Sequence, residues 1–125
     1  MIGVRAGAFA LTLVSCVVSA SALCEGLMTL DFSWRGIAAC VGGSRSPAFS
    51  VRNAPPGTYR ISLTLSHGGT EYGGEQIPYP PGGDVLAGTI YTNGPCQPGD
   101  YRWNVVALDR SGRTLAAADR IRVFP

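Results

Sequence analysis

Two segments of this chain alternate between apolar and polar residues, and each predicts a half-buried β-strand. The first has four large apolar residues at every second position: Met28, Leu30, Phe32 and Trp34. The second repeats the pattern with Tyr59, Ile61, Leu63 and Leu65. Because successive side chains of a strand point to opposite faces, each segment would bury these residues and leave its polar residues in solvent.

Residues 94–119 contain a loop, a strand, a tight turn and a returning segment. One strand face carries Tyr101, Trp103, Val105 and Ala107, and Val106 and Leu108 make the other face apolar as well. This pattern predicts an interior strand that is buried on both faces. Asp109 to Gly112 have turn-forming side chains, so the sequence predicts a hairpin there.

The remaining segments are shorter. We predict loops at 36–46 and 53–57, a short strand at 48–51, a β-prone segment at 85–91 and a final strand at 120–124, while 115–118 would also suit a helix. The seventeen residues 67–83 show no convincing strand, and a loop of that length is usually functional or mobile. Six or seven short strands predict a single-domain, all-β sandwich, a pattern that immunoglobulin-like modules share.

The amino terminus resembles a secretory signal. Arg5 precedes an apolar run at 6–18, and Ala20-Ser21-Ala22 is a small-x-small cleavage site, so the mature chain is expected to begin at Leu23. An uncleaved membrane helix is the weaker alternative, because the run is shorter than the roughly 20 residues of a span. A lipoprotein box at 13–16, which would leave Cys16 acylated, is the other alternative. We therefore expect an exported protein, periplasmic or secreted.

Charge and composition exclude one class of partner. The chain of 125 residues carries a net charge of +2, and its arginines are scattered without a basic run. Nucleic-acid binding requires clustered cations, so no nucleic-acid partner is expected. Residues 23–125 suffice for one domain with a modest core.

Three cysteines, Cys24, Cys40 and Cys96, remain after cleavage, so at least one stays outside an internal disulfide. Loop-closure entropy favours Cys40–Cys96 by about 4 kcal/mol and Cys24–Cys40 by about 3 kcal/mol, which does not decide between them. No Cys-x-x-Cys occurs, so redox-motif and zinc-ribbon sites are not indicated.

Catalytic and metal-binding patterns are weak. His67 is the single histidine, with Glu71, Glu75 and Asp84 downstream, and this spacing does not define a metal site. No Gly-x-Ser-x-Gly elbow or phosphate-binding glycine loop is present. We predict no enzymatic activity, no cofactor and no metal.

Several short motifs resemble the phosphatidylethanolamine-binding protein family, which includes the Raf kinase inhibitor proteins. They are Gly94-Pro95-Cys96, Tyr101-x-Trp103, Ala107-Leu108-Asp109, Ser46-Pro47-Ala48-Phe49, Pro56-Gly57-Thr58 and Phe124-Pro125. The resemblance covers about residues 31–125. It implies a trimmed version of that family's β fold and a small pocket at one end of the sheet for a phospholipid headgroup or another anion.

Alignment on Gly94-Pro95-Cys96 transfers this pocket to five residues: His67, Tyr72, Gly94, Pro95 and Tyr101. Tyr72 and Gly99 stand where the relatives have histidines. The resemblance also implies a Cys40–Cys96 disulfide, with Cys24 as the free thiol. The alternative for Tyr72 and Tyr101 is ordinary packing, and the alternative function is an immunoglobulin-like interaction or structural module without a pocket, presenting an exposed strand edge or apolar patch.

Overall fold

The computed structural model describes residues 27–39 and 44–125, and these form β-strands and turns. The strands are β1 (Thr29–Phe32), β2 (Ser44–Arg45), β3 (Phe49–Arg52), β4 (Arg60–His67), β5 (Thr70–Pro78), β6 (Asp84–Val85), β7 (Tyr91–Thr92), β8 (Gly99–Leu108) and β9 (Thr114–Phe124). A short 3-10 turn, η2 (Pro81–Gly83), precedes β6.

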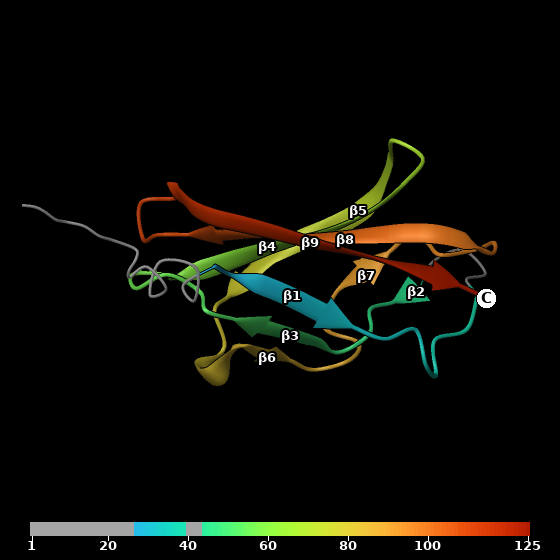
Figure 1. Cartoon of the computed structure of the whole chain (residues 1–125), viewed down its shortest axis with the longest axis horizontal. Coiled ribbons are helices and arrows are strands. Elements are labelled where there is room, and N and C mark those ends of the chain that lie inside the picture. Colours follow the sequence, from blue (N-terminus) through green and yellow to red (C-terminus); the bar gives the residue numbers. More distant parts are fainter. Residues whose placement is uncertain (1–26, 40–43) are drawn as a thin grey trace, which may run out of the picture.

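The strands form two main antiparallel sheets that pack as a sandwich (Figure 1). One sheet has the order β1-β3-β6 and the other β5-β4-β8-β9, while β2 and β7 form a separate two-stranded pair. This arrangement confirms the predicted all-β fold. The described part has nine strands rather than six or seven, because β2, β6 and β7 have only two residues each.

The core lies between the two main sheets. The three-stranded sheet contributes Leu30, Phe32, Phe49 and Val51, and the other sheet contributes Ile61, Leu63, Leu65, Trp103 and Val105, all at most 5 % exposed. The Phe49 and Trp103 rings meet edge to face, with centroids 4.8 Å apart. Aromatic contacts of this kind add to the burial of apolar area that holds the sheets together.

The two alternating segments fold largely as expected. Met28, Leu30, Phe32 and Trp34 are all buried along β1 and its flanks. In β4 the prediction holds for Ile61, Leu63 and Leu65, but Tyr59 lies just before the strand and is 44 % exposed. The residues expected to be helical or extended at 115–118 belong to the single long strand β9.

The prediction of a strandless loop at 67–83 is wrong. Residues 70–78 form β5, which pairs with β4 and stands at the edge of the four-stranded sheet. Its residues are exposed or half-buried, because an edge strand has few neighbours to cover it. Exposure on both faces removes the alternation by which a strand is recognised in sequence.

Strand β8 lies between β4 and β9, which confirms an interior position. The prediction that both its faces are buried is wrong: Tyr101, Trp103, Val105 and Ala107 are buried, whereas Arg102 is exposed and Asn104 and Val106 are half-buried. The outer face of the sheet is covered by no second layer in the described part. The turn at Asp109–Gly112 joins β8 to β9 as a hairpin, as predicted.

Candidate functional site

The five residues predicted to form a pocket lie together at one end of the four-stranded sheet. The His67 ring of β4 stacks on the Tyr101 ring of β8, with centroids 4.5 Å apart and an interplanar angle of 24°. The Tyr72 ring of β5 lies 6.4 Å from His67 and 6.1 Å from Tyr101. A side chain at Gly94 would contact the Tyr72 ring, and Pro95, which follows a cis peptide bond, is buried.

Tyr101 lies in the core rather than at an open surface. It is 3 % exposed, and the rings of Trp34 and Phe124 pack against it with centroid distances of 6.1 and 6.2 Å. Its hydroxyl donates a hydrogen bond to the Gln97 carbonyl oxygen at 2.9 Å. The structure therefore brings the five residues together as a packed aromatic cluster, and their predicted role in ligand binding stays a prediction.

His67 is half-buried and also reaches the outer face of the sheet. Its Nδ1 donates to the Asp100 carbonyl oxygen at 2.6 Å, since a carbonyl oxygen only accepts. With Glu71, Asp100 and Arg102 it lines an open hollow of about 670 Å³. Within the described ranges, no group of three or more His, Cys, Asp or Glu side chains is placed to hold a metal ion.

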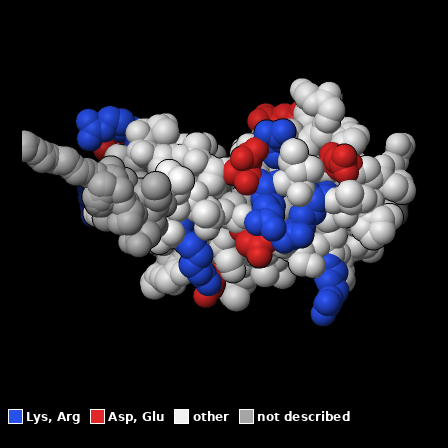
Figure 2. Space-filling view, in the orientation of Figure 1, with Lys and Arg blue, Asp and Glu red and all other residues white. Residues whose placement is uncertain are grey.

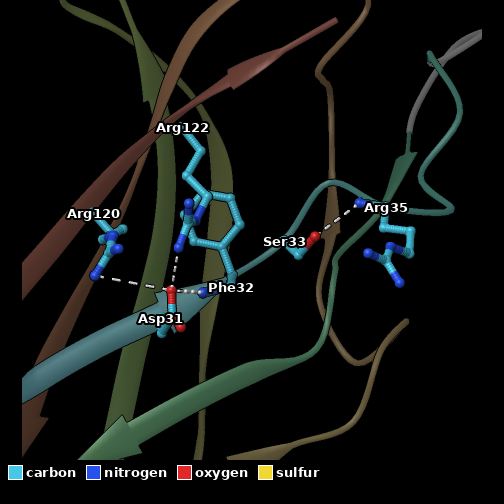
Figure 3. A network of polar contacts seen from close by, with 6 residues as sticks. All are labelled: Asp31, Phe32, Ser33, Arg35, Arg120 and Arg122. Atoms are coloured by element: carbon cyan, nitrogen blue, oxygen red, sulfur yellow. Dashed lines mark hydrogen bonds and ion pairs between the residues drawn. The ribbon is translucent and has the colours of Figure 1, made fainter.

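A second polar site, which the sequence did not reveal, links the two sheets along β1 and β9. Arg122 Nη2 donates to Asp31 Oδ1 at 2.7 Å, and Arg120 Nη1 lies 3.9 Å from the same oxygen (Figure 3). The Arg122 hydrogen bond, together with the Phe32 backbone amide and the charge of both arginines, holds the pKa of Asp31 below its usual value, although desolvation opposes it. Figure 2 shows arginine and acidic side chains side by side on this face.

The sequence held one signal for this site. Arg120 and Arg122 are two positions apart, so in a strand they share a face. Ala118 and Phe124 lie on the same face and pack in or against the core, so the two arginines lie next to it. The arginines appear scattered in the sequence because their partner Asp31 lies 91 residues away from Arg122 in the chain, so the sequence alone did not reveal this ion pair.

An open hollow of about 670 Å³, with both polar and apolar walls, adjoins Arg122. It is formed by the segment that follows β1 and by the end of β9, and its lining residues are Ser33, Trp34, Arg35, Gly36, Ile37, Ile121, Arg122, Val123 and Pro125. The Trp34 indole donates from Nε1 to the Arg122 carbonyl oxygen at 3.1 Å, which fixes one wall to the other.

A third exposed site lies at the opposite end of β9, where the loops before β4 and after β8 meet. The Arg110 guanidinium stacks over the Tyr59 ring, 4.2 Å from its centroid. Asp109 Oδ1 accepts from the Ser111 and Arg113 amides, both at 2.9 Å, and from the Ser111 hydroxyl at 2.7 Å. These bonds lower the pKa of Asp109, the Ser111 hydroxyl most strongly, and hold the loop in one conformation.

Comparisons with protein families, with curated proteins and with solved structures gave no match to this chain. The resemblance to the phosphatidylethanolamine-binding family therefore stays a prediction. Among residues 27–39 and 44–125, no helix has the length and apolarity needed to cross a membrane. The expected cleavage before Leu23, the acylation of Cys16, the thiol of Cys24 and the position of Cys40 lie outside the described residues.

Proposed function

We propose that this protein is an exported, non-enzymatic interaction module of the immunoglobulin-like type. The strand order carries this proposal. Apart from the two-residue strands β2 and β7, the first, second and fifth strands share one sheet, and the third, fourth, sixth and seventh share the other. Immunoglobulin-type domains divide strands A, B, E and C, F, G in the same way. The fourth strand, β5, lies in the sheet that corresponds to C, F and G, like strand C′ of variable-type domains and unlike strand D of constant-type domains.

The tyrosine contact near the start of the sixth strand supports the same architecture. In immunoglobulin-like domains a tyrosine at this position bonds through its hydroxyl to the backbone a few residues upstream. Tyr101, the third residue of β8, bonds to the carbonyl oxygen of Gln97, four residues earlier. Fold alone does not define function, so an interaction module must also have a surface suited to binding a partner.

The loop end with Tyr59 and Arg110 supplies that surface. Tyrosine and arginine are enriched in the energetically dominant positions of protein interfaces, and loops at this end of the sandwich form the binding site of antibody variable domains. Tyr59 is 44 % exposed, and Arg110 makes no ion pair within the described part of the chain. The rigid Asp109 turn lowers the entropy lost on binding.

The test places a photo-crosslinking amino acid at Arg110 in the full exported chain, with Leu86 as the control. Leu86 is 79 % exposed on a different loop. We expect one discrete protein adduct from position 110 and none from position 86. The absence of an adduct at position 110, or the same adducts from both positions, would contradict the proposal.

A second candidate function is binding of a phospholipid headgroup or small anion, as the family resemblance implies. The convergence of His67, Tyr72, Gly94, Pro95 and Tyr101 favours it. Titration with phosphate, phosphoethanolamine and phospholipid vesicles would be followed by tryptophan fluorescence. We expect a response that His67→Gln abolishes and Glu75→Gln preserves. A response that survives His67→Gln unchanged would exclude this site.

The export proposal includes a Cys40–Cys96 disulfide with Cys24 free. The family resemblance carries this pairing, since Cys40 lies outside the described residues. Peptide mapping without reduction should find this bond and an amino terminus at Leu23. A bond that includes Cys24 would contradict the pairing.

A further inference from the structure

We propose that the hollow between the end of β9 and the segment after β1 binds an anionic amphiphile, that is, a small molecule with one anionic group on an apolar body. This site goes beyond the interaction surface proposed above. The two lie at opposite ends of β9, one beyond Thr114 and the other at Ile121–Pro125.

The walls of the hollow supply apolar surface that is left in contact with water. Val123 is 67 % exposed and Ile121 is 49 % exposed. They flank Arg122 along the edge strand β9 and line the hollow together with Trp34, Ile37 and Pro125. An apolar chain that covers this surface would remove it from water, and this burial would favour binding by about 25 cal/mol for each Å² of apolar surface. The apolar body of a ligand is therefore expected to lie along this wall.

The rim of the same hollow is cationic. Arg35 and Arg122 line it, and no acidic side chain does. Arg120 and Arg122 share the carboxylate of Asp31, and the guanidinium of Arg35 makes no ion pair within the described ranges. The guanidinium of Arg35 thus leaves cationic charge at the rim. An anionic headgroup would complement it, since arginine binds carboxylate and phosphate through several donors.

The hollow is built before any ligand arrives. The Ile37 amide bonds to the Trp34 carbonyl oxygen at 3.0 Å, and the Arg35 amide bonds to the Ser33 hydroxyl at 3.1 Å. Between them Gly36 takes a φ of 79°, which a glycine adopts without strain. With the Trp34–Arg122 bond, these contacts fix both walls, so a ligand would lose little affinity to ordering the protein.

Three probes that share either the carboxylate or the apolar chain test the ligand class on the folded mature protein. They are dodecanoate, acetate and dodecyltrimethylammonium, each below its aggregation concentration, and Trp34 fluorescence and calorimetry report binding. We expect dodecanoate to bind and the other two not, because acetate lacks the chain and dodecyltrimethylammonium has the opposite charge. Equal binding of the cationic probe, binding of acetate alone, or no binding of dodecanoate would each overturn the proposal.

Matched variants test the location. Arg35→Gln and Val123→Ser should each weaken dodecanoate binding by about tenfold, the effect of losing one charge-assisted or apolar contact. Arg60→Gln makes the same change of charge, and Leu86→Ser a similar apolar-to-polar change, outside the hollow, so both should leave the affinity unchanged. Arg35, Leu86 and Val123 are exposed and Arg60 is half-buried, and chemical unfolding would verify that the variants fold. Equal losses in the hollow variants and their controls would show that the binding lies elsewhere.

Discussion

At the scale of single residues, Asp31 shows how one exposed carboxylate joins the two sheets. Its side chain is 58 % exposed, yet it accepts from Arg122 of the other sheet at 2.7 Å. Solvent screens such a pair, so its contribution to stability is modest. The contact nevertheless positions Arg122, whose guanidinium lies over the Phe32 ring and which lines the hollow beside Trp34.

Replacing Asp31 by Asn should lower the free energy of unfolding by roughly 0.2–1 kcal/mol at pH 7, the range of exposed ion pairs. Because Arg122 lowers the pKa of Asp31 in the folded state, the unfolded state binds protons first as the pH falls. The stabilisation is therefore present above the ordinary carboxyl pKa of 3.8 and is lost as the pH falls through the lowered folded-state pKa. Urea unfolding of both proteins across this pH range measures the difference.

Glu75→Gln is the control for that experiment, since Glu75 is an exposed carboxylate of β5 without an ion pair in the described part. It should change the stability little at any pH. If the difference in unfolding free energy between the wild-type and Asp31→Asn proteins did not depend on pH, the charge of the Asp31 carboxylate would not be the source of the stabilisation.

Tyr101→Phe isolates the hydroxyl that bonds to the Gln97 carbonyl oxygen. The ring stays in place against Trp34 and Phe124, so the loss should be one hydrogen bond, about 1 kcal/mol. Tyr59→Phe serves as the control because that hydroxyl lies on an exposed side chain at the loop end. Urea unfolding should separate the two variants, and equal stabilities would argue against a structural role for the Tyr101 hydroxyl.

At the scale of elements, strands with one buried and one solvated face were predictable. In β1 and β4 the apolar positions alternate because they face the other sheet, and Asp109 to Gly112 carry the residues that a tight turn requires. Strand β5 was missed because Gly73, Gly74 and polar residues replace the apolar half of the pattern. Backbone pairing with β4, which no side-chain pattern records, makes it a strand.

Gly74 explains why glycine interrupts β5. A Cβ there would overlap the carbonyl oxygen of Leu63 in β4, at a φ of 156° that side chains rarely adopt. Gly74→Ala should therefore destabilise the fold by roughly 1–3 kcal/mol, through displacement of the β4–β5 backbone. Gly57→Ala is the matched control, because Gly57 also has a positive φ, 92°, but a Cβ added there would meet no atom within 4 Å.

Thermal unfolding of both glycine variants measures the effect, and hydrogen exchange of the β4 and β5 amides locates it. Gly57→Ala should lower the free energy of unfolding by only about 1 kcal/mol, the cost of holding an alanine in the left-handed backbone conformation. If the two variants were equally stable, close approach of the backbones would not be the reason for glycine at position 74.

At the scale of the whole molecule, the sequence predicted the sandwich but only part of its candidate sites. The grouping of His67, Tyr72 and Tyr101 was expected from the family resemblance, and the pairing of β4 with β5 and with β8 brings the three rings together. Asp31 with Arg122, and Tyr59 with Arg110, were not expected, because each pair depends on how distant strands pack. Contacts between sheets carry no local sequence signal, whereas the faces of single strands do.

A single core shared by both sheets should make residues 23–125 unfold as one cooperative unit. Trp103 packs on Phe49 across the sandwich, and Trp34 packs on Tyr101 and Phe124 at its end, so tryptophan fluorescence reports both regions. In urea, fluorescence and far-ultraviolet circular dichroism should trace the same single transition, with a slope of about 1–3 kcal/mol/M. Separate transitions would mean that the β1-β3-β6 sheet detaches before the four-stranded sheet unfolds, and that the contacts across the sandwich are weaker than their burial implies.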